Sequence, residues 1–330
     1  MKYRRLAKTE LDVSVVCFGC WGVIGGFNWG AQDEQDSVAA LQTAYDAGIN
    51  FYDSAEGYGN GQSEQLLTRA LGHVREKIVI ATKVSPTHFA PLDLRAACEQ
   101  SLKNLATDYI DLYQLHWPNH DLPIEPTLSA LVQLKSEGKI RAYGVSNFGI
   151  NDLSNALGTH AAISSNQLAY SLLFRAIEYE VLPLCIGSEL SVLTYSSLMQ
   201  GLLSGRYFSA DDVQPDRART RHYSSQRPFA RHGEDGQEQS TFEVVTAIRQ
   251  LAEEIGKPMA DLSLAWLLAQ PGVTAVIAGA RNTAQAIGIA RAADMTLDND
   301  TILRLSGLTA TLKEKLGRNP DMWQGISRMR

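Results

Sequence analysis

Four side chains that can exchange a proton, or hold a charge beside one, come at the ends of three neighbouring apolar segments: Asp53, Tyr58, Lys83 and His116. A tyrosine acts as an acid at neutral pH only if its pKa, about 10 when free, is lowered, and a nearby ammonium group lowers it by stabilising the phenolate. Lys83 is the candidate for that group, and Asp53 can keep it protonated as a counter-charge. His116 can hydrogen-bond the oxygen of a substrate and help to orient it. The four predict a site that protonates a developing alkoxide while another molecule delivers hydride.

Each of these residues alone has a plainer interpretation. An aspartate after a strand is often a helix cap or a turn residue, and a lysine at a strand end usually points to solvent. A lone histidine is often a satisfied structural group, and a tyrosine after a glycine often packs on a loop. The conjunction of the four at adjacent strand ends favours the chemical interpretation. This chemistry needs no metal, since one histidine is evident at these strand ends and the ligand spacings of zinc sites are missing.

Eight short apolar or β-branched segments alternate with longer segments of helical period along most of the chain. The predicted strands are 13–18, 49–52, 78–82, 110–115, 140–145, 163–168, 192–194 and 273–277. The predicted helices are 33–47, 63–71, 92–105, 126–137, 150–157, 177–187, 259–270 and 283–293. This alternation is typical of repeated βα units with parallel strands and right-handed helical crossovers.

Eight such units close most naturally into a (β/α)8 barrel, and the alternative is an open doubly wound sheet. The open sheet is disfavoured because no helix begins in phosphate-binding register after the glycine-rich segment 19–30. In addition, no acidic residue ends a second strand at the position that binds ribose in such sheets. We therefore predict one TIM-barrel domain over residues 1–330, with its site at the carboxyl ends of the strands.

Three segments lie outside this repeat. Residues 1–12 are predicted to form a short hairpin that could close the bottom of the barrel. The segment 204–239 has no sustained period, and a loop this long after the seventh strand is either an active-site lid or a mobile solvated loop. The tail is predicted to contain a helix at about 300–315 and to be docked by Trp323.

The composition limits the class of partner. The 330 residues are 45% hydrophobic and carry a formal net charge of −6, which argues against nucleic acid, because phosphates are neutralised by a concentrated basic surface. No apolar run reaches the roughly 20 residues that cross a bilayer, and the charged N-terminus lacks the apolar stretch of a secretory signal. We expect a cytoplasmic protein with a small-molecule partner, either a monomer or a homo-oligomer. Cys17 and Cys20 lie on a predicted strand and its exit, so we expect buried, reduced thiols.

Several motifs resemble those of the aldo-keto reductases, and the resemblance covers almost the whole chain. The stretches that carry it are DSAEGYGNGQSE at 53–64, ATK at 81–83, QLHWP at 114–118, GKIRAYGVSNF at 138–148, TYSSLMQGLLSGRY at 194–207 and IAGARNTAQ at 277–285. The resemblance implies a (β/α)8 barrel that transfers hydride between a carbonyl compound and NADPH, with NADH possible. It also implies that the four residues above are the catalytic tetrad.

The same resemblance implies how the cofactor is held. Contacts with the nicotinamide carboxamide are implied for Ser146, Asn147 and Gln167, and stacking on the ring for Tyr195. Contacts along the pyrophosphate are implied for Ser196, Leu198 and Gly201, and a further cofactor motif comprises Gly279, Arg281 and Gln285.

The chain departs from the family pattern near the adenosine. Gly288 and Ile289 stand where many members carry an acidic residue and an asparagine that hold adenine, and Ser197 stands where proline is common. Arg281 can still pair with a 2′-phosphate as a charge-assisted fork. NADPH is therefore expected as the cofactor, with NADH as the alternative.

Aromatic residues lie on the segments that leave the predicted rim: Trp21, Phe27, Trp29, Trp117 and Phe148. We expect Trp21 and Trp117 to line a substrate pocket, since aromatic walls suit a carbonyl on a ring or a short chain. The other three either line it as well or pack in the core or a lid.

Three functions are compatible with these residues. The first is NADPH-dependent reduction of aldehydes or ketones with Tyr58 as general acid. The second keeps the site but has oxidation of a sugar or polyol as its physiological direction. The third is a cofactor-binding regulatory subunit, because the chain also resembles the β-subunits of potassium channels, which retain the tetrad.

Overall fold

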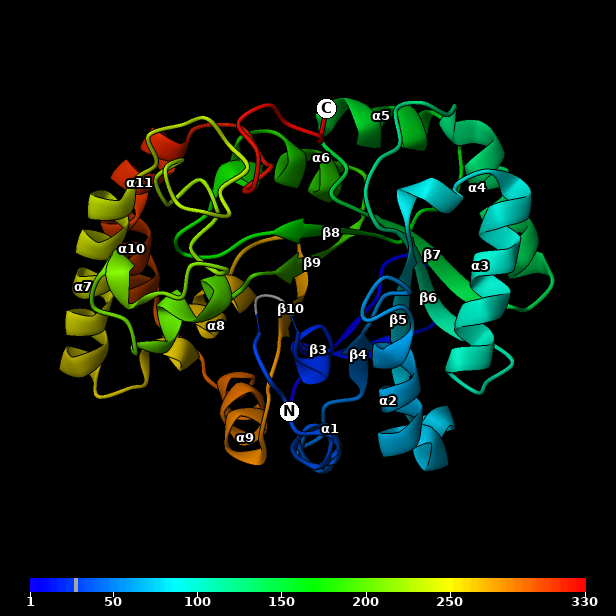
Figure 1. Ribbon diagram of the computed structural model, residues 1–330, viewed down its shortest axis with the longest axis horizontal. Helices are drawn as coiled ribbons and strands as arrows, with labels where there is room; N and C mark the ends of the chain where they lie inside the picture. The colour runs from blue at the N-terminus through cyan, green and yellow to red at the C-terminus, as the bar shows by residue number, and fades with distance from the viewer. Residues whose placement is uncertain (27–28) are drawn as a thin grey trace.

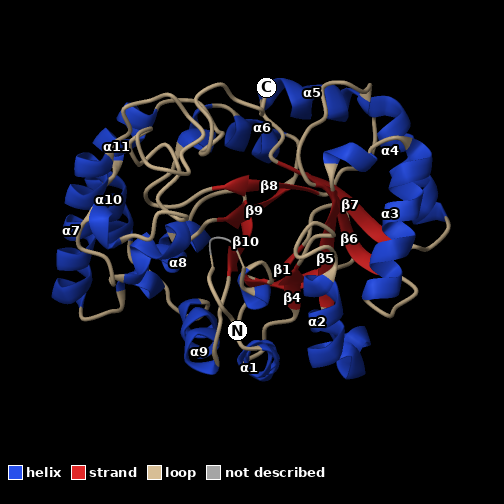
Figure 2. Cartoon of the chain, viewed as in Figure 1, coloured by secondary structure: helices blue, strands red, loops and turns tan. Residues whose placement is uncertain are grey.

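The computed structural model describes residues 1–26 and 29–330, and its main strands form a closed barrel. The eight parallel strands are β3 (Val16–Gly19), β4 (Phe51–Asp53), β5 (Val79–Val84), β6 (Ile110–Leu115), β7 (Ile140–Ser146), β8 (Ser165–Ala169), β9 (Ser191–Tyr195) and β10 (Val273–Ala278). They follow one another around the barrel in chain order, and β10 pairs with β3 to close it. Figures 1 and 2 show these strands at the centre with helices around them. The predicted (β/α)8 fold is confirmed.

The helices cover the outside of the barrel and extend beyond it at one side. They are α1 (Glu34–Asp46), α2 (Gln62–Leu71), α3 (Pro91–Asn104), α4 (Ile124–Ser136), α5 (Ile150–Gly158), α6 (Val181–Gly187), α7 (Glu238–Ile255), α8 (Met259–Leu268), α9 (Thr283–Ala292), α10 (Asn299–Leu308) and α11 (Ala310–Leu316). Short 3-10 turns occupy Gly22–Ile24, Gly72–Lys77, Pro86–His88, Ala176–Tyr179, Met199–Ser204 and Ala210–Asp212. Helices α7, α10 and α11 pack together at one side of the molecule (Figure 1). No helix of the described residues is both long and apolar enough to cross a membrane.

The local sequence explains where the helices begin and end. Asp33 precedes α1 and accepts hydrogen bonds from the amides of Gln35 and Asp36 at 2.7 and 3.1 Å, which satisfies two N–H groups of the first turn. Gly48 follows α1 with a φ of +91°, a conformation that glycine adopts without strain. Asn282 caps α9 in the same way as Asp33 caps α1, by accepting from the Gln285 amide at 2.9 Å.

The inside of the barrel is a small apolar core that the N-terminal hairpin closes. The hairpin pairs β1 (Tyr3–Arg5) with β2 (Asp12–Ser14) in antiparallel register. Its buried Leu6 and Leu11 belong to the same apolar cluster as the inward-facing Phe51, Leu112 and Leu193. The predicted hairpin is therefore present, and it packs against the interior of the barrel.

Two predicted boundaries were wrong near the chain ends. The strand predicted at 13–18 is divided, because β2 belongs to the hairpin and β3 begins only at Val16. The division falls where the Ser14 hydroxyl donates to the Val16 carbonyl at 2.7 Å. In the tail, the helix predicted at 300–315 is interrupted at Thr309, which separates α10 from α11.

Helix α7 was not predicted, although its periodic signal is present in the sequence. Its buried residues recur at intervals of three or four positions or stand side by side on one face: Thr241, Val245, Ile248, Leu251 and Ala252. The segment before it, 204–239, is not a simple solvated loop. Arg221, His222 and Tyr223 are buried, and Arg221 donates to Glu234 and to the carbonyls of Leu316 and Asn319.

The cysteines are buried and free, as predicted for Cys17 and Cys20. Burial raises the pKa of both thiols well above the usual range. Neither is therefore a reactive thiolate at neutral pH.

Candidate functional site

A cavity of about 1030 Å³ lies at the carboxyl ends of the barrel strands. The last residues of five strands line it: Gly19, Asp53, Ser146, Tyr195 and Ala278. The remaining lining includes further predicted site residues, most of them on loops, with Gln167 on β8 and Gln285 on α9: Trp21, Tyr58, His116, Trp117, Asn147, Gln167, Ser196, Leu198, Gly201, Gly279, Arg281 and Gln285. Lys83 is fully buried beneath this surface. The structure thus brings the predicted residues to one cavity and its floor.

Lys83 and Asp53 form a buried ion pair beneath Tyr58. The Lys83 Nζ atom lies 2.5 Å from Asp53 Oδ1 and donates to the Ser54 carbonyl at 2.8 Å. The same nitrogen lies 5.1 Å from the centroid of the Tyr58 ring. Adjacent strands bring the pair together, since β4 and β5 are parallel neighbours whose register sets Asp53 opposite Ala81.

His116 and Trp21 both contact the Tyr58 ring, in different orientations. The centroids of the His116 and Tyr58 rings are 5.8 Å apart with an interplanar angle of 77°, so one ring meets the other edge-on. Trp21 stacks on Tyr58 with centroids 5.9 Å apart, and Trp29 meets Trp21 edge-on at 5.5 Å. Tyr58 therefore contacts both an imidazole and the indole of a tryptophan pair.

Amide donors satisfy the second oxygen of Asp53. Gln167 Nε2 donates to Asp53 Oδ2 at 2.7 Å, and Gln114 Nε2 lies 3.4 Å from the same oxygen. A buried carboxylate is tolerated when an opposite charge and further donors surround it. Gln167, which the family resemblance assigns to the cofactor carboxamide, therefore also supports the ion pair.

Burial and the ion pair set the protonation of the three titratable groups. Burial works against the charge of Lys83, but Asp53 and Tyr58 outweigh it and raise the pKa of Lys83. Burial raises the pKa of Tyr58, and the Lys83 charge only partly opposes this rise. The expectation of a lowered tyrosine pKa was therefore wrong in direction, because desolvation of the phenolate exceeds its attraction to Lys83. Burial, helped by the Lys83 charge, lowers the pKa of His116 to about 3.

Polar groups at the ends of β6 to β9 form a continuous network beside this cluster. Asn147 has a left-handed backbone with a φ of +62°, and its Nδ2 donates to the His116 carbonyl at 3.0 Å and to Ser146 Oγ at 3.1 Å. The Tyr195 hydroxyl donates to Asn147 Oδ1 at 2.7 Å. Ser146 Oγ in turn donates to the Gln167 carbonyl at 3.1 Å. The network fixes the side chains that line this side of the cavity.

The turn after β9 follows the cavity with an unusual backbone. Ser196, Gln200 and Gly201 all have positive φ angles, of 53°, 53° and 101°. The φ of Gly201 favours glycine, and a Cβ atom there would also displace the flexible end of the Arg206 side chain, whose Nη2 would lie 2.6 Å away. Ser197, which replaces the common proline, donates to the Thr194 carbonyl at 2.9 Å and so braces the turn.

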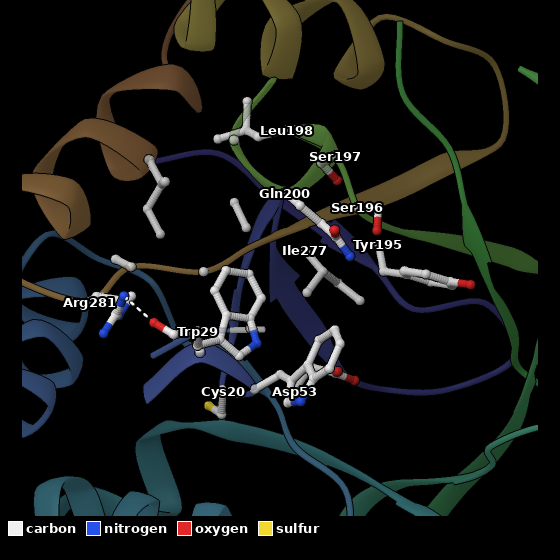
Figure 3. Close-up of a pocket in the computed structure, with 18 of the residues that line it drawn as sticks. Cys20, Trp29, Asp53, Tyr195, Ser196, Ser197, Leu198, Gln200, Ile277 and Arg281 are labelled. Carbon is white, nitrogen blue, oxygen red and sulfur yellow. Dashed lines mark hydrogen bonds between the residues drawn. The ribbon is translucent and has the colours of Figure 1, made fainter. Parts of the chain in front are cut away.

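Arg281 holds the loop that follows β3, on the side of the cavity away from Tyr195 (Figure 3). Its guanidinium donates to the Trp29 carbonyl at 2.7 Å, to Gln32 Oε1 at 2.6 Å and to the Ala31 carbonyl. Arg206 and Arg217 lie close enough for their charges to lower the pKa of Arg281 further after its burial. These two arginines were missed, although the abundance of arginine in the segment 204–239 was a signal for them.

The positions that depart from the family pattern also line the cavity. A Cβ atom at Gly288 would meet nothing within 4 Å, and Ile289 is buried beside it. The cavity is therefore open along α9 at the place where the resemblance expects a larger polar side chain.

Some of the aromatic residues expected near the rim line the cavity, and others do not. Trp21, Trp29 and Trp117 line the cavity, whereas Phe148 is buried and is not part of its lining. Phe27 lies outside the described residues. The C-terminal tail adds Trp323 and Arg328 to the cavity lining. The sequence did not lead us to predict this role for either residue.

Comparison with known proteins identifies the family to which the chain belongs. Residues 15–310 match the family model described as Aldo/keto reductase family. The aldo-keto reductase YhdN of Bacillus subtilis (strain 168) is 33% identical over 314 residues, which cover 91% of each chain. The NADH-specific methylglyoxal reductase of Escherichia coli (strain K12) is 32% identical over 306 residues, which cover 85% of this chain and 90% of that relative.

The similar proteins also include a solved structure and a relative named as a potassium channel subunit. The crystal structure of an aldo/keto reductase from Klebsiella pneumoniae in complex with NADP and acetate superposes with a TM-score of 0.75 at 29% identity, covering 93% of this chain and 95% of that one. A probable voltage-gated potassium channel subunit beta of Arabidopsis thaliana is 29% identical over 303 residues, which cover 86% of this chain and 89% of that relative. The similar proteins thus carry names of reductases and of a channel subunit, and both of these functions were considered from the sequence.

Proposed function

Because the chain belongs to the aldo/keto reductase family, we propose that it reduces aldehydes or ketones to alcohols with NADPH, and that Tyr58 is the proton donor. The observation that carries this proposal is the buried Lys83–Asp53 pair beneath Tyr58, beside a neutral His116, at the floor of the cavity. A structural ion pair alone would not need a tyrosine and a histidine above it that both face a cavity.

The cavity suits a phosphate-bearing dinucleotide. It extends from Tyr58 to the N-terminus of α9, where free backbone amides favour negative charge. Arg206, Arg217 and Arg281 gather on this side, and guanidinium groups bind phosphate through charge-assisted hydrogen bonds. NADPH is favoured because of this cationic group, and NADH remains the alternative, as one relative is named NADH-specific.

We assign the lining residues to the cofactor by their places in the cavity. The network of Ser146, Asn147 and Gln167 would hold the nicotinamide carboxamide near Tyr58, and the Tyr195 ring would lie against the nicotinamide. The turn with Ser196, Leu198 and Gly201 would follow the pyrophosphate. The residues Gly279, Arg281 and Gln285 would hold the adenosine end, with Arg281 exchanging its loop carbonyls for the 2′-phosphate.

Tyr58 and the side chains around it have separate roles in the proposed proton transfer. When bound, NADPH supplies the hydride to the carbonyl carbon. Tyr58 keeps its phenolic proton at neutral pH and, although its pKa is raised, can donate it to the developing alkoxide, because an alkoxide is a stronger base than a phenolate. Lys83 stabilises the phenolate that remains, and Asp53 keeps Lys83 charged. His116 is neutral and can donate one ring N–H to the carbonyl oxygen, while Trp21 and Trp117 exclude water.

A fluorescence titration with NADPH and NADH, followed by turnover of 4-nitrobenzaldehyde, tests this function. We expect NADPH to bind more tightly than NADH and the aldehyde to be reduced. Binding without turnover of any aldehyde, ketone, sugar or polyol would support a regulatory subunit instead. Faster oxidation of polyols than reduction of aldehydes would support the reverse direction, and no binding of either cofactor would overturn the proposal.

The variant Arg281→Gln adds a test of cofactor choice to that titration. We expect NADPH to bind about 10-fold or more weakly and NADH to be little affected, because a hydrogen bond to a charged group is worth about 1.5–3 kcal/mol. Arg304→Gln serves as the control, since Arg304 lies outside the cavity in an ion pair with Glu254. Equal losses for both cofactors would show that Arg281 acts only by holding the Trp29 loop.

The pH dependence of reduction follows from the two shifted groups. His116 is neutral above about pH 3 and Tyr58 keeps its proton beyond neutrality, so neither changes charge in the physiological range. We expect kcat for the reduction to stay nearly constant from about pH 5 to pH 8. Measurement of kcat across this range checks it. An inflection near the ordinary histidine pKa of 6.5 would show that His116 titrates in the working enzyme.

A further inference from the structure

The cavity is cationic although the chain as a whole is acidic. Among the described residues, seven arginines and four aspartates line it, while the formal net charge of the chain is −6. Arg206, Arg217 and Arg281 belong to the phosphate side proposed above. A second group comprises Arg219, Arg231 and Arg328, and the proposed reaction gives these three no role.

Arg328 lines the cavity and presents its guanidinium to the ring of Trp117, which also lines the cavity. Its central carbon lies 3.8 Å from the centroid of the Trp117 ring, and Trp117 directly follows His116 in the chain. Arg328 Nε and Nη2 donate to the Asp321 carboxylate at 2.7 and 3.0 Å. Asp321 is fully buried and is absent from the cavity lining, whereas 37% of the Arg328 side chain is exposed. The Arg328 guanidinium is therefore exposed to the cavity, and the Asp321 carboxylate is buried outside the cavity lining.

The tail holds Arg328 in a fixed place. Asp321 also accepts from the Trp323 amide at 3.0 Å, and Trp323 lies against the Tyr195 hydroxyl. The Arg330 carbonyl accepts from the amides of Asn151 and Asp152 at the start of α5, at 2.8 and 3.0 Å. The tail is thus held near Tyr195 through Trp323 and at the start of α5 through Arg330, and Figure 1 shows its end beside α5.

A second guanidinium lies against the same tail, on Trp323. The central carbon of Arg219 lies 4.6 Å from the centroid of the Trp323 ring. Burial lowers the pKa of Arg219 and the nearby charge of Arg231 lowers it further, while the charge of Asp216 works in the opposite direction. The charges of Arg219 and Arg231 therefore interact, and Arg219 contacts Trp323, which belongs to the same tail as Arg328.

We propose that the site prefers carbonyl substrates that carry a carboxylate, and that Arg328 binds this group. The inference rests on the proposed reductase function. A guanidinium has two edges that can each hold a carboxylate by paired N–H groups. Asp321 occupies the edge formed by Nε and Nη2, so the edge formed by Nη1 and Nη2 is left for the substrate. Trp117 supports the face of the same guanidinium, and both side chains line the cavity that Tyr58 and His116 also line.

The test compares two aldehydes that differ in one charge, 4-carboxybenzaldehyde and its methyl ester, methyl 4-formylbenzoate. We expect kcat/KM of the unaltered enzyme to be about 10-fold or more higher for the carboxylate, since a hydrogen bond to a charged group is worth about 1.5–3 kcal/mol. Arg328→Met should remove this preference by raising KM for the carboxylate, with kcat and the ester little changed. Arg304→Met is the matched control, because it removes an arginine that forms two hydrogen bonds to a carboxylate outside the cavity.

A second variant guards against a folding defect. Arg328→Met alone leaves Asp321 as a buried, unpaired carboxylate, which destabilises a fold. The double variant Asp321→Asn with Arg328→Met removes both charges and should show the same loss of preference. Equal kcat/KM of the unaltered enzyme for the two aldehydes would overturn the inference, as would equal losses for both substrates in the variants. Failure to reduce the carboxylate aldehyde by an enzyme that still reduces 4-nitrobenzaldehyde would overturn this inference alone, whereas failure with all three aldehydes would count against the reductase function on which it rests.

Discussion

Tyr58→Phe lowers the rate of carbonyl reduction by roughly 10²- to 10⁴-fold, the usual contribution of a positioned proton donor. The change removes the hydroxyl and keeps the ring, so the contacts with Trp21 and His116 are preserved. The dissociation constant for NADPH should therefore stay within a few-fold of its original value. Single-turnover rates with 4-nitrobenzaldehyde and a fluorescence titration measure the two quantities separately.

Tyr3→Phe is the matched control for that variant. Its hydroxyl donates to the Gly48 carbonyl at 2.8 Å on the exposed hairpin, away from the cavity. The control should leave rate and binding unchanged. A Tyr58→Phe enzyme that retained its rate would show that another group, or water, protonates the alkoxide.

Lys83→Met has the second large effect, because it acts on both chemistry and stability. Without the ammonium group, the phenolate of Tyr58 loses its stabilising charge, and we expect a loss of at least roughly 10²-fold in kcat. The fully buried Asp53 also loses its partner, which costs about 3–5 kcal/mol of folding free energy. Steady-state kinetics and denaturant unfolding measure the two losses.

The double variant Asp53→Asn with Lys83→Met separates these effects. An asparagine can still accept from Gln167 and carries no unpaired charge, so the double variant should recover much of the lost stability and none of the lost rate. Lys139→Met, which removes the partner of Glu99 outside the cavity, is the control. Recovery of the rate together with the stability would mean that Lys83 serves only the fold.

The barrel could be predicted from sequence because each βα unit carries its own local signal. The strand segments are apolar and short, and residues such as Asp33 and Gly48 mark the ends of helices. The tetrad could be predicted for a related reason: parallel strands bring their carboxyl ends to one rim, whatever their separation in the chain. Helix α7 was missed even though Val245 and Ile248 show its period, because the unpatterned segment before it obscured the start.

Other features depend on contacts that no local pattern encodes. Arg328 reaches the cavity only because Asp321 and α5 fix an irregular tail, and Arg217 reaches it through an irregular segment packed on the core. The direction of the Tyr58 pKa shift depends on the balance between burial and the charge of Lys83. That balance follows from the packing around the ring, which the sequence does not contain.

The closure of the barrel has a consequence for how the protein folds. The seam joins β3, at Val16–Gly19, to β10, at Val273–Ala278, so almost the whole chain must be placed before these strands can pair. Contacts of such separation are costly in chain entropy and form late. The cavity touches both sides of the seam, at Gly19 and at Ala278. Recovery of cofactor binding during refolding therefore reports the last step of assembly, and a bound dinucleotide would hold the seam together against unfolding.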